Sequence, residues 1–99
     1  MIVEHALLHI KPGRTGDFEQ AMREAKPLIT CQPGFKSIEL RRSSGQENQY
    51  LLLVEWDRIE SHQDGFRKSS EYEKWRTLLH DFYEPMPSVE YFGTSLFND

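Results

Sequence analysis

Residues 50–75 read YLLLVEWDRIESHQDGFRKSSEYEKW and contain most of what decides the fold. The first seven residues, YLLLVEW, are largely apolar at both odd and even positions, which is typical of a strand covered on both sides. Two runs with the capping-box pattern follow, Asp57–Glu60 and Ser70–Glu73, and each predicts the start of a helix. Ile59, His62 and Phe66 would share one face of the first helix. The stretch therefore predicts a strand followed by two short helices.

The second of these helices has an apolar stripe along one side. The residues of this stripe are Tyr72, Trp75, Leu79 and Phe82. Pro85 and Pro87 would end the helix, because a proline cannot supply the N–H that a helix interior needs. Residues Val89 to Leu96 then predict a final strand.

Before residue 50 the chain predicts one strand and one long helix. Residues 1–10, MIVEHALLHI, alternate with apolar residues on both faces, which again indicates cover on both sides. The helix that follows has an apolar stripe from Phe18 to Ile29, with Thr15 as its expected N-cap. Pro27 interrupts this stripe, so we expect the helix to kink or end close to it.

A hairpin connects this helix to the stretch quoted above. Gln32–Phe35, QPGF, places Pro and Gly at the two central positions of a type II turn. Phe35–Arg42 and Gln49–Trp56 then read as two antiparallel strands. The whole order is β-α-β-β-α-α-β, which predicts an α+β fold: one ferredoxin-like split βαβ unit with an antiparallel sheet, in a single domain over residues 1–99.

This architecture raises a question about the uncovered side of the sheet. Helices on one side leave the other side bare, yet the first and third strands are apolar on both faces. Packing of the sheet against a second copy would bury that face. The sequence therefore predicts a homodimer.

Charge and cysteine content exclude several classes of protein. A net charge of −4 argues against a nucleic-acid partner, since nucleic acids reward clustered positive charge. No apolar run is long enough to span a membrane, and no secretory leader is evident, so we expect a cytoplasmic protein. The single cysteine, Cys31, excludes an intrachain disulfide and a cysteine-based zinc site.

Taken together, these segments resemble the antibiotic biosynthesis monooxygenase family over nearly the whole chain. The resemblance rests on the opening Ile-Val-Glu strand with Ile10-Lys11-Pro12-Gly13, on Phe18 and Ala21, on Pro33-Gly34-Phe35, on LLLVEW with His62, Gly65-Phe66-Arg67, Ser69, Tyr72 and Trp75, and on Val89-Glu90-Tyr91. It implies a dimeric α+β barrel. It also implies one of two chemistries, cofactor-independent oxidation of phenols by molecular oxygen or haem degradation.

The haem-degrading members use an asparagine, a tryptophan and a histidine. Those positions fall near Ala6, Phe66 and Arg76 in this chain, and none of the three matches. The resemblance therefore favours a cofactor-independent oxygenase that needs no cofactor and no metal. Its partners would be a small aromatic molecule and molecular oxygen.

Such an enzyme must deprotonate a phenol or enol and hold the resulting anion in a dry pocket. His62 is the candidate catalytic base, since a neutral histidine accepts a proton near pH 7. The alternative is a helix histidine that only supports packing. The candidate substrate-binding residues are Trp56, Phe66, Tyr72, Trp75 and Phe82. Aromatic residues at helical spacing are usually core, but in so small a domain the same space is also the expected pocket.

Other polar residues suggest weaker roles. His5 and His9 lie two apart on one strand face, so they could share a cavity or a metal ion, although an interface role is favoured. Arg67 could balance an anion, and Glu90 could orient a histidine. His80 and Tyr83 are expected on the solvent side or at the helix end.

Three functions remain open from the sequence. The first is a monooxygenase that acts on a small aromatic or quinol-type substrate. The second is an isomerase or other proton-transfer enzyme of the same barrel fold, because the same base and pocket would serve it. The third is a non-catalytic dimer that binds a small ligand in a stress response.

Overall fold

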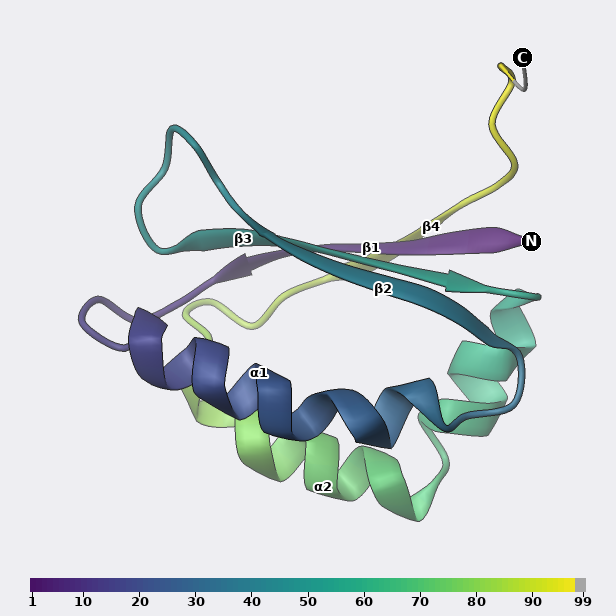
Figure 1. The fold of residues 1–99 in the computed structure, drawn as a ribbon, viewed down its shortest axis with the longest axis horizontal. Helices are drawn as coiled ribbons and strands as arrows, with labels where there is room; N and C mark the ends of the chain where they lie inside the picture. Colours follow the sequence, from purple (N-terminus) through teal and green to yellow (C-terminus); the bar gives the residue numbers. More distant parts are fainter. Residues whose placement is uncertain (98–99) are drawn as a thin grey trace.

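The chain folds into one antiparallel sheet with all helices on one side, as a computed structural model of residues 1–97 describes it (Figure 1). The strands are β1 (Ile2–His9), β2 (Phe35–Arg42), β3 (Gln49–Trp56) and β4 (Val89–Phe92), in the spatial order β2-β3-β1-β4. The helices are α1 (Thr15–Thr30), the π-helical segment η1 (Ser61–Phe66), α2 (Ser70–Leu79) and the short 3₁₀ turn η2 (His80–Phe82). The α+β ferredoxin-like fold predicted from the sequence is confirmed.

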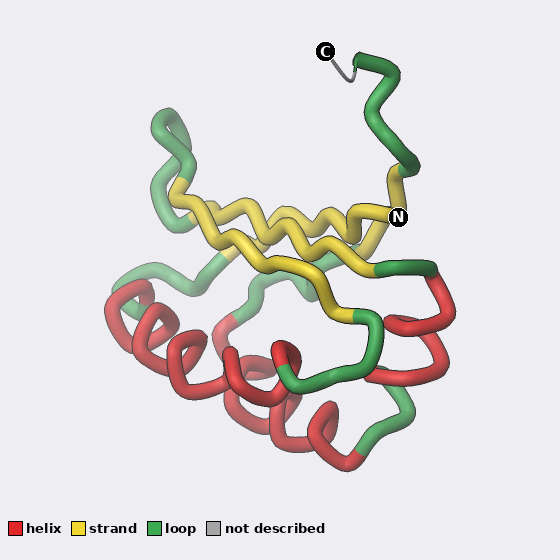
Figure 2. The backbone as a smooth tube through the Cα atoms, turned by 45° about the vertical axis from the view of Figure 1, so that its right-hand side comes forward, coloured by secondary structure: helices red, strands yellow, loops and turns green. Residues whose placement is uncertain are grey.

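The sheet and the helices form two layers, which Figure 2 shows from a second direction. Even-numbered residues of β1 and β3 face the helices, and the apolar ones among them form the core with residues from α1, η1 and α2. Fully buried members of this core are Leu8, Phe18, Ile29, Val54, Trp56, Phe66 and Leu79. Burial of such large side chains contributes about 1.5–3 kcal/mol each, so this layer contact is the main source of stability.

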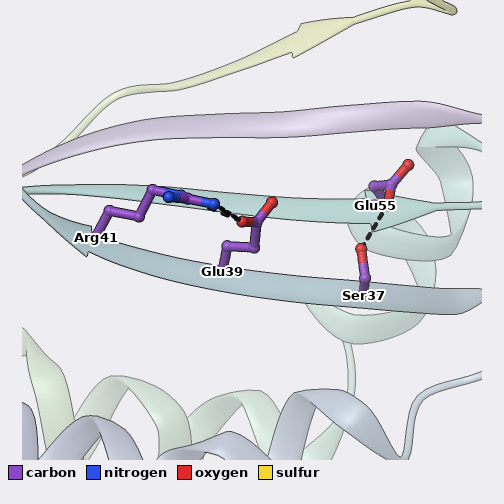
Figure 3. A network of polar contacts seen from close by, with 4 residues as sticks. All are labelled: Ser37, Glu39, Arg41 and Glu55. Atoms are coloured by element: carbon purple, nitrogen blue, oxygen red, sulfur yellow. Dashed lines mark hydrogen bonds and ion pairs between the residues drawn. The ribbon is translucent and has the colours of Figure 1, made fainter.

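The opposite face of the sheet carries no helix among residues 1–97. Leu7 of β1 is 43% exposed and Phe92 of β4 is 52% exposed on this side. Along the β2 edge the face is polar: the Ser37 hydroxyl donates to Glu55 Oε1 at 2.6 Å, and Arg41 pairs with Glu39 (Figure 3). On this face, exposed apolar residues of β1 and β4 thus lie on the part of the sheet away from the charged β2 edge.

The turn before β2 forms as predicted and also anchors η1. The Phe35 N–H donates to Gln32 O at 3.1 Å, and Gly34 has φ +85°, the left-handed value that the third residue of a type II turn requires. A Cβ on Gly34 would collide with the side chains of Asp57 and Ser61. The Asp57 N–H donates to Gly34 O at 2.8 Å, so the turn is held against the start of the helical segment.

Several predicted boundaries differ from the structure. Thr15 is the first residue of α1, and Arg14 is its N-cap residue. Pro27 lies inside α1, which continues to Thr30. Pro27 is exposed, and burial of Ile29, one residue before the end, holds the last turn against the core. The predicted kink or end therefore falls within one turn of the proline.

The two predicted capping boxes are also wrong in detail. Asp57 donates its N–H to the preceding turn rather than to Glu60, and η1 begins at Ser61 with no side-chain cap. Helix α2 is capped by Ser69, one residue earlier than predicted, whose hydroxyl accepts from the Tyr72 N–H at 3.2 Å. An N-cap of this kind stabilises a helix by about 1 kcal/mol.

The last strand is shorter than predicted, ending at Phe92 rather than Leu96. Val3 pairs with Phe92, so Ile2 is the one residue of β1 beyond that pair, and β4 has almost nothing left to pair with. The chain then leaves the sheet on the side away from the helices (Figure 1), and Leu96 is 94% exposed.

Candidate active site

Four polar side chains meet between the sheet and η1. Glu4 of β1 and His62 of η1 are only 4% and 3% exposed. The Trp56 indole N–H donates to Glu4 Oε1 at 2.9 Å, and His62 Nε2 lies 3.4 Å from the same oxygen. On the other side of its ring, His62 Nδ1 lies 2.6 Å from the Tyr91 hydroxyl oxygen. The four residues form one line of polar contacts, with hydrogen bonds at its two ends and the 3.4 Å contact between Glu4 and His62 in its middle.

The sheet register brings Glu4 and Tyr91 together. Glu4 shares the helix-facing side of β1 with Ala6 and Leu8, which are both buried. In the β1–β4 ladder Glu4 lies directly opposite Tyr91, and residues in such a pair point to the same face. A carboxylate is therefore fixed on the core side of a central strand.

His62 is placed by the π-helical turn. The Arg67 N–H donates to His62 O at 2.9 Å, the i to i+5 bond that defines such a turn. The turn directs both His62 and Phe66 toward the sheet, where their rings lie 5.5 Å and 6.2 Å from the Trp56 ring. Single π turns are frequent at functional sites, where they re-aim a side chain.

Burial favours the neutral forms of both titratable groups. Loss of water raises the pKa of Glu4 to about 7, although the Trp56 hydrogen bond and the positive charge of Arg67 oppose this. Loss of water also lowers the pKa of His62 to about 4, and Arg67 adds to the effect. His62 is therefore neutral at pH 7, and Glu4 is poised between its acid and base forms.

A cavity of about 130 Å³ lies next to Glu4 and His62, between the sheet and the helices. Glu4 and His62 line it together with three of the predicted aromatic residues, Phe66, Tyr72 and Trp75. The exposed side chains of Arg67, Arg76 and His80 also line it, so the cavity meets solvent at a rim that carries two arginines.

Two predicted substrate-binding residues lie elsewhere. Trp56 is fully buried behind Glu4 and does not line the cavity, so it contacts the carboxylate rather than a ligand. Phe82 packs against Phe18, with ring centroids 5.9 Å apart, and the Arg14 guanidinium lies over its ring at 4.7 Å. The helical stripe ends before Phe82, because η2 turns this residue toward α1.

Three of the weaker candidates are also separated from the site. His5 and His9 lie on the open face of the sheet, and Glu90 lies opposite His5 in the β1–β4 ladder, too far round the strand to reach His62. Tyr83 was expected on the solvent side or at the helix end. It lies at the helix end, directly after η2, where it lines the cavity, and burial raises the pKa of its hydroxyl.

The sequence reasoning missed Glu4 and Tyr91. The sequence did contain an indication for Glu4. It lies at an even-numbered position, on the same face of the predicted strand as Ala6, Leu8 and Ile10. A carboxylate on the buried face of a strand is rare unless it has a partner or a function. Tyr91 gave no comparable signal, because its contact with His62 spans 29 residues.

A larger hollow of about 280 Å³ lies between α1 and β2. Its polar centre is Glu19, which is already paired with Arg42 and Tyr50. A carboxylate held in this way by a guanidinium is not available for proton transfer near pH 7. The smaller cavity beside Glu4 and His62 is the better candidate for chemistry.

Within residues 1–97, no three His, Cys, Asp or Glu side chains lie close enough together to hold a metal ion. No helix in this part of the chain has the length and apolar character needed to cross a bilayer.

Comparison with known proteins adds a family to this geometry. The sequence profile described as antibiotic biosynthesis monooxygenase matches residues 1–78. The uncharacterised protein YczJ of Bacillus subtilis is 48% identical over 92 residues, which cover 93% of this chain and 97% of YczJ.

Solved structures show the same fold. A Bordetella bronchiseptica protein whose name assigns it to the antibiotic biosynthesis monooxygenases is 32% identical, with a TM-score of 0.91 over 96% of this chain and 97% of that one. SnoaB from Streptomyces nogalater, described as a cofactor-independent oxygenase, is 16% identical, with a TM-score of 0.84 over 97% of this chain and 94% of SnoaB. At that identity the likeness to SnoaB concerns the fold alone.

Proposed function

The chain belongs to the antibiotic biosynthesis monooxygenase family, and from this premise we propose that it is a cofactor-independent monooxygenase. Its substrate would be a small aromatic or quinol-type molecule, oxidised by molecular oxygen. The observation that carries the proposal is a buried carboxyl group with a pKa near 7, beside a neutral histidine, in a cavity with aromatic walls. This is the equipment that deprotonation of a phenol needs at neutral pH.

Glu4 and His62 are proposed to act as one acid–base pair. Both ring nitrogens of His62 already face partners, Tyr91 on one side and Glu4 on the other. The ionised Glu4 carboxylate is therefore the group that takes the phenolic proton, while His62 fixes its position and its charge. This assignment moves the base from His62, the candidate from the sequence, to the residue beside it.

The proposed reaction balances without a reductant. Glu4 removes the phenolic proton, and the phenolate passes one electron to oxygen, giving superoxide and an aryloxyl radical. These two combine at a ring carbon that carries hydrogen, and a carbon–oxygen bond forms. Cleavage of the O–O bond, with loss of the ring hydrogen and return of a proton from Glu4, then gives a quinone and one water. The substrate supplies all the electrons, so a phenol plus O₂ becomes a quinone plus water.

The size of the cavity favours a substrate with one ring. Its volume is about 130 Å³, and an apolar cavity of about 150 Å³ is known to hold a single benzene. Phe66, Tyr72 and Trp75 would form the walls around that ring. Larger polycyclic phenols would require the rim to open.

We also propose that the working unit is a homodimer formed through the open sheet face. Leu7 and Phe92 are exposed there, and exposed apolar residues that gather on one face mark an interaction surface. Light scattering at micromolar concentration is expected to give twice the monomer mass. A monomer would remove this part of the proposal and leave the site unchanged.

Oxygen consumption by the purified, metal-stripped protein tests the function. The panel consists of single-ring phenols and hydroquinones, with an anthrone as a larger comparison. Uptake above the uncatalysed rate, retained in Glu19→Gln and lost in Glu4→Gln and His62→Ala, would support the proposal. No uptake across the panel would overturn it.

The same acid–base pair also supports proton transfer without oxygen, the second function left open by the sequence. In that case the protein would exchange substrate hydrogen with deuterated water and consume no oxygen. Binding of an aromatic ligand with neither reaction would instead favour the non-catalytic reading.

A further inference from the structure

A buried acid–base group needs a route by which its proton reaches solvent. Glu4 lies on the helix-facing side of a central strand, and only 4% of it is exposed. The Trp56 N–H that contacts Glu4 is a donor only and cannot accept a proton. Of the two polar side chains that contact Glu4, His62 alone can both accept and donate.

His62 is in turn connected to the surface. Its Nδ1 lies 2.6 Å from the hydroxyl oxygen of Tyr91, which is half-buried at the end of the sheet. Gln63, next to His62 in the sequence, is exposed to solvent. The line Glu4, His62, Tyr91 therefore runs from the interior to the edge of the molecule.

Two arrangements of protons satisfy every contact along this line. In the first, the Glu4 carboxylic acid donates to His62 Nε2, His62 Nδ1–H donates to the Tyr91 oxygen, and the Tyr91 O–H points to water. In the second, His62 Nε2–H donates to the Glu4 carboxylate and the Tyr91 O–H donates to Nδ1. The Trp56 N–H donates to Glu4 in both. The two arrangements differ by one proton.

We propose that Glu4, His62 and Tyr91 form a proton relay through which Glu4 exchanges its proton with solvent while the cavity is occupied. In one passage the Glu4 O–H bond breaks as His62 Nε2–H forms, and His62 Nδ1–H breaks as the new Tyr91 O–H forms. The proton that Tyr91 held passes to water. The separation of 3.4 Å between Glu4 and His62 shortens as the proton moves.

This proposal rests on the proposed function for the role of Glu4 as base, whereas the route itself belongs to the free protein. Tyr91 is a relay residue and does not touch the substrate. The route can therefore be tested without any turnover, and its failure is distinguishable from failure of the oxygenase reaction.

The test is the exchange of the His62 ring N–H proton with water, measured by NMR on ¹⁵N-labelled protein at pH 7. Tyr91→Phe keeps the ring and removes the hydroxyl, and it is expected to slow this exchange by roughly tenfold or more. A ring signal that is lost to rapid exchange in the wild type and appears in the variant is the same result. Tyr50→Phe, which removes a hydroxyl bonded to Glu19, is the matched control and should leave the exchange unchanged.

Backbone amide exchange of the same samples guards against local unfolding, since a loosened η1 would speed His62 exchange by a different route. An exchange rate in Tyr91→Phe within a factor of about two of the wild type, with intact amide protection, would overturn the relay. A relay that passes this test in a protein without oxygen uptake would stand while the proposed function falls. Oxygen uptake with unaltered exchange in Tyr91→Phe would give the reverse.

Discussion

Two glutamates of this protein each lie near a basic side chain and a tyrosine, but their pKa values shift in opposite directions. Glu4 lies beside His62 and close to Tyr91, whereas Glu19 of α1 accepts from Arg42 at 2.6 Å and 2.8 Å and from the Tyr50 hydroxyl at 2.6 Å. Burial raises the pKa of Glu4 to about 7. The Arg42 hydrogen bonds lower the pKa of Glu19 to about 2.

The two pKa values differ because the two glutamates have different partners and because only the Glu19 pair is exposed to water. Arg42 is always charged and reaches solvent, so it holds Glu19 ionised at every ordinary pH. His62 is buried with Glu4, and two neutral groups cost less there than two ions. The Glu19 carboxylate, paired with the Arg42 guanidinium, joins α1 to the sheet. The Glu4 carboxylate, beside a neutral imidazole, can gain and lose a proton near pH 7.

The largest expected effect separates the two glutamates by activity. Glu4→Gln keeps the shape of the side chain but cannot take a proton, so oxygen uptake should fall by about 100-fold or more. Glu19→Gln should leave uptake within about threefold of the wild type, since surface changes away from the site are usually small. Equal losses in both variants would show that the comparison concerns folding rather than catalysis.

A second prediction concerns stability against pH. The folded-state pKa of Glu4, about 7, lies above its ordinary 4.5, so the folded state keeps a proton that the unfolded state has released in that window. The free energy of unfolding therefore falls as pH rises from 4.5 to 7. The pKa of His62 is lowered from 6.5 to about 4, so its contribution rises between pH 4 and 6.5. The two slopes largely cancel in the wild type.

Single variants should expose each slope. His62→Gln leaves a fall of up to about 3 kcal/mol between pH 4.5 and 7, and Glu4→Gln leaves a rise of similar size between pH 4 and 6.5. Arg67 stays charged over this range, and Tyr83 and Tyr91 stay neutral because burial raises the pKa of each hydroxyl. Urea unfolding at each pH measures the slopes. Curves parallel to the wild type in both variants would contradict the assignment.

Removal of the Trp56 indole should sharpen the comparison further. Trp56→Phe deletes the donor that lowers the pKa of Glu4, so the rise of activity with pH should move to higher pH. The smaller ring also leaves space in the core, at a cost of about 1–3 kcal/mol. The pH profile of kcat/KM distinguishes the two effects, because lost packing alone would not move it.

The smallest effect is expected for replacement of Arg42, the partner of Glu19. Arg42→Gln breaks the ion pair with Glu19, but the Arg42 side chain is 74% exposed. Exposed ion pairs contribute about 0–1 kcal/mol, so thermal unfolding should show a shift of only a few degrees. A loss several times larger would mean that this cluster fixes the position of α1 more firmly than its exposure indicates.

The sequence predicted the fold well and the site in part. Alternation in β1 and β3 and the stripe of α1 indicate strands and helices directly, because each pattern repeats within one element. The end of β4 was mispredicted, since it depends on where β1 begins and not on the residues of β4.

The site itself needed contacts that no local pattern encodes. His62 and the aromatic walls could be named because they lie within 14 residues of one another. Glu4 contacts Trp56 across 52 residues, and its raised pKa follows only from the three-dimensional burial. The alternation of the strand places Glu4 on the same face as Ala6 and Leu8, but whether that face is buried depends on which side of the sheet the helices cover.

The most direct test of the central claim is an NMR titration of the glutamate side-chain carboxyl carbons in ¹³C-labelled protein. The account predicts that Glu4 titrates with a midpoint near pH 7, while Glu19 stays ionised from pH 7 down to pH 3. Glu4→Gln and Glu19→Gln assign the two signals. A Glu4 midpoint at or below its ordinary value of 4.5 would contradict the account, because the carboxylate would then be a permanent ion like Glu19.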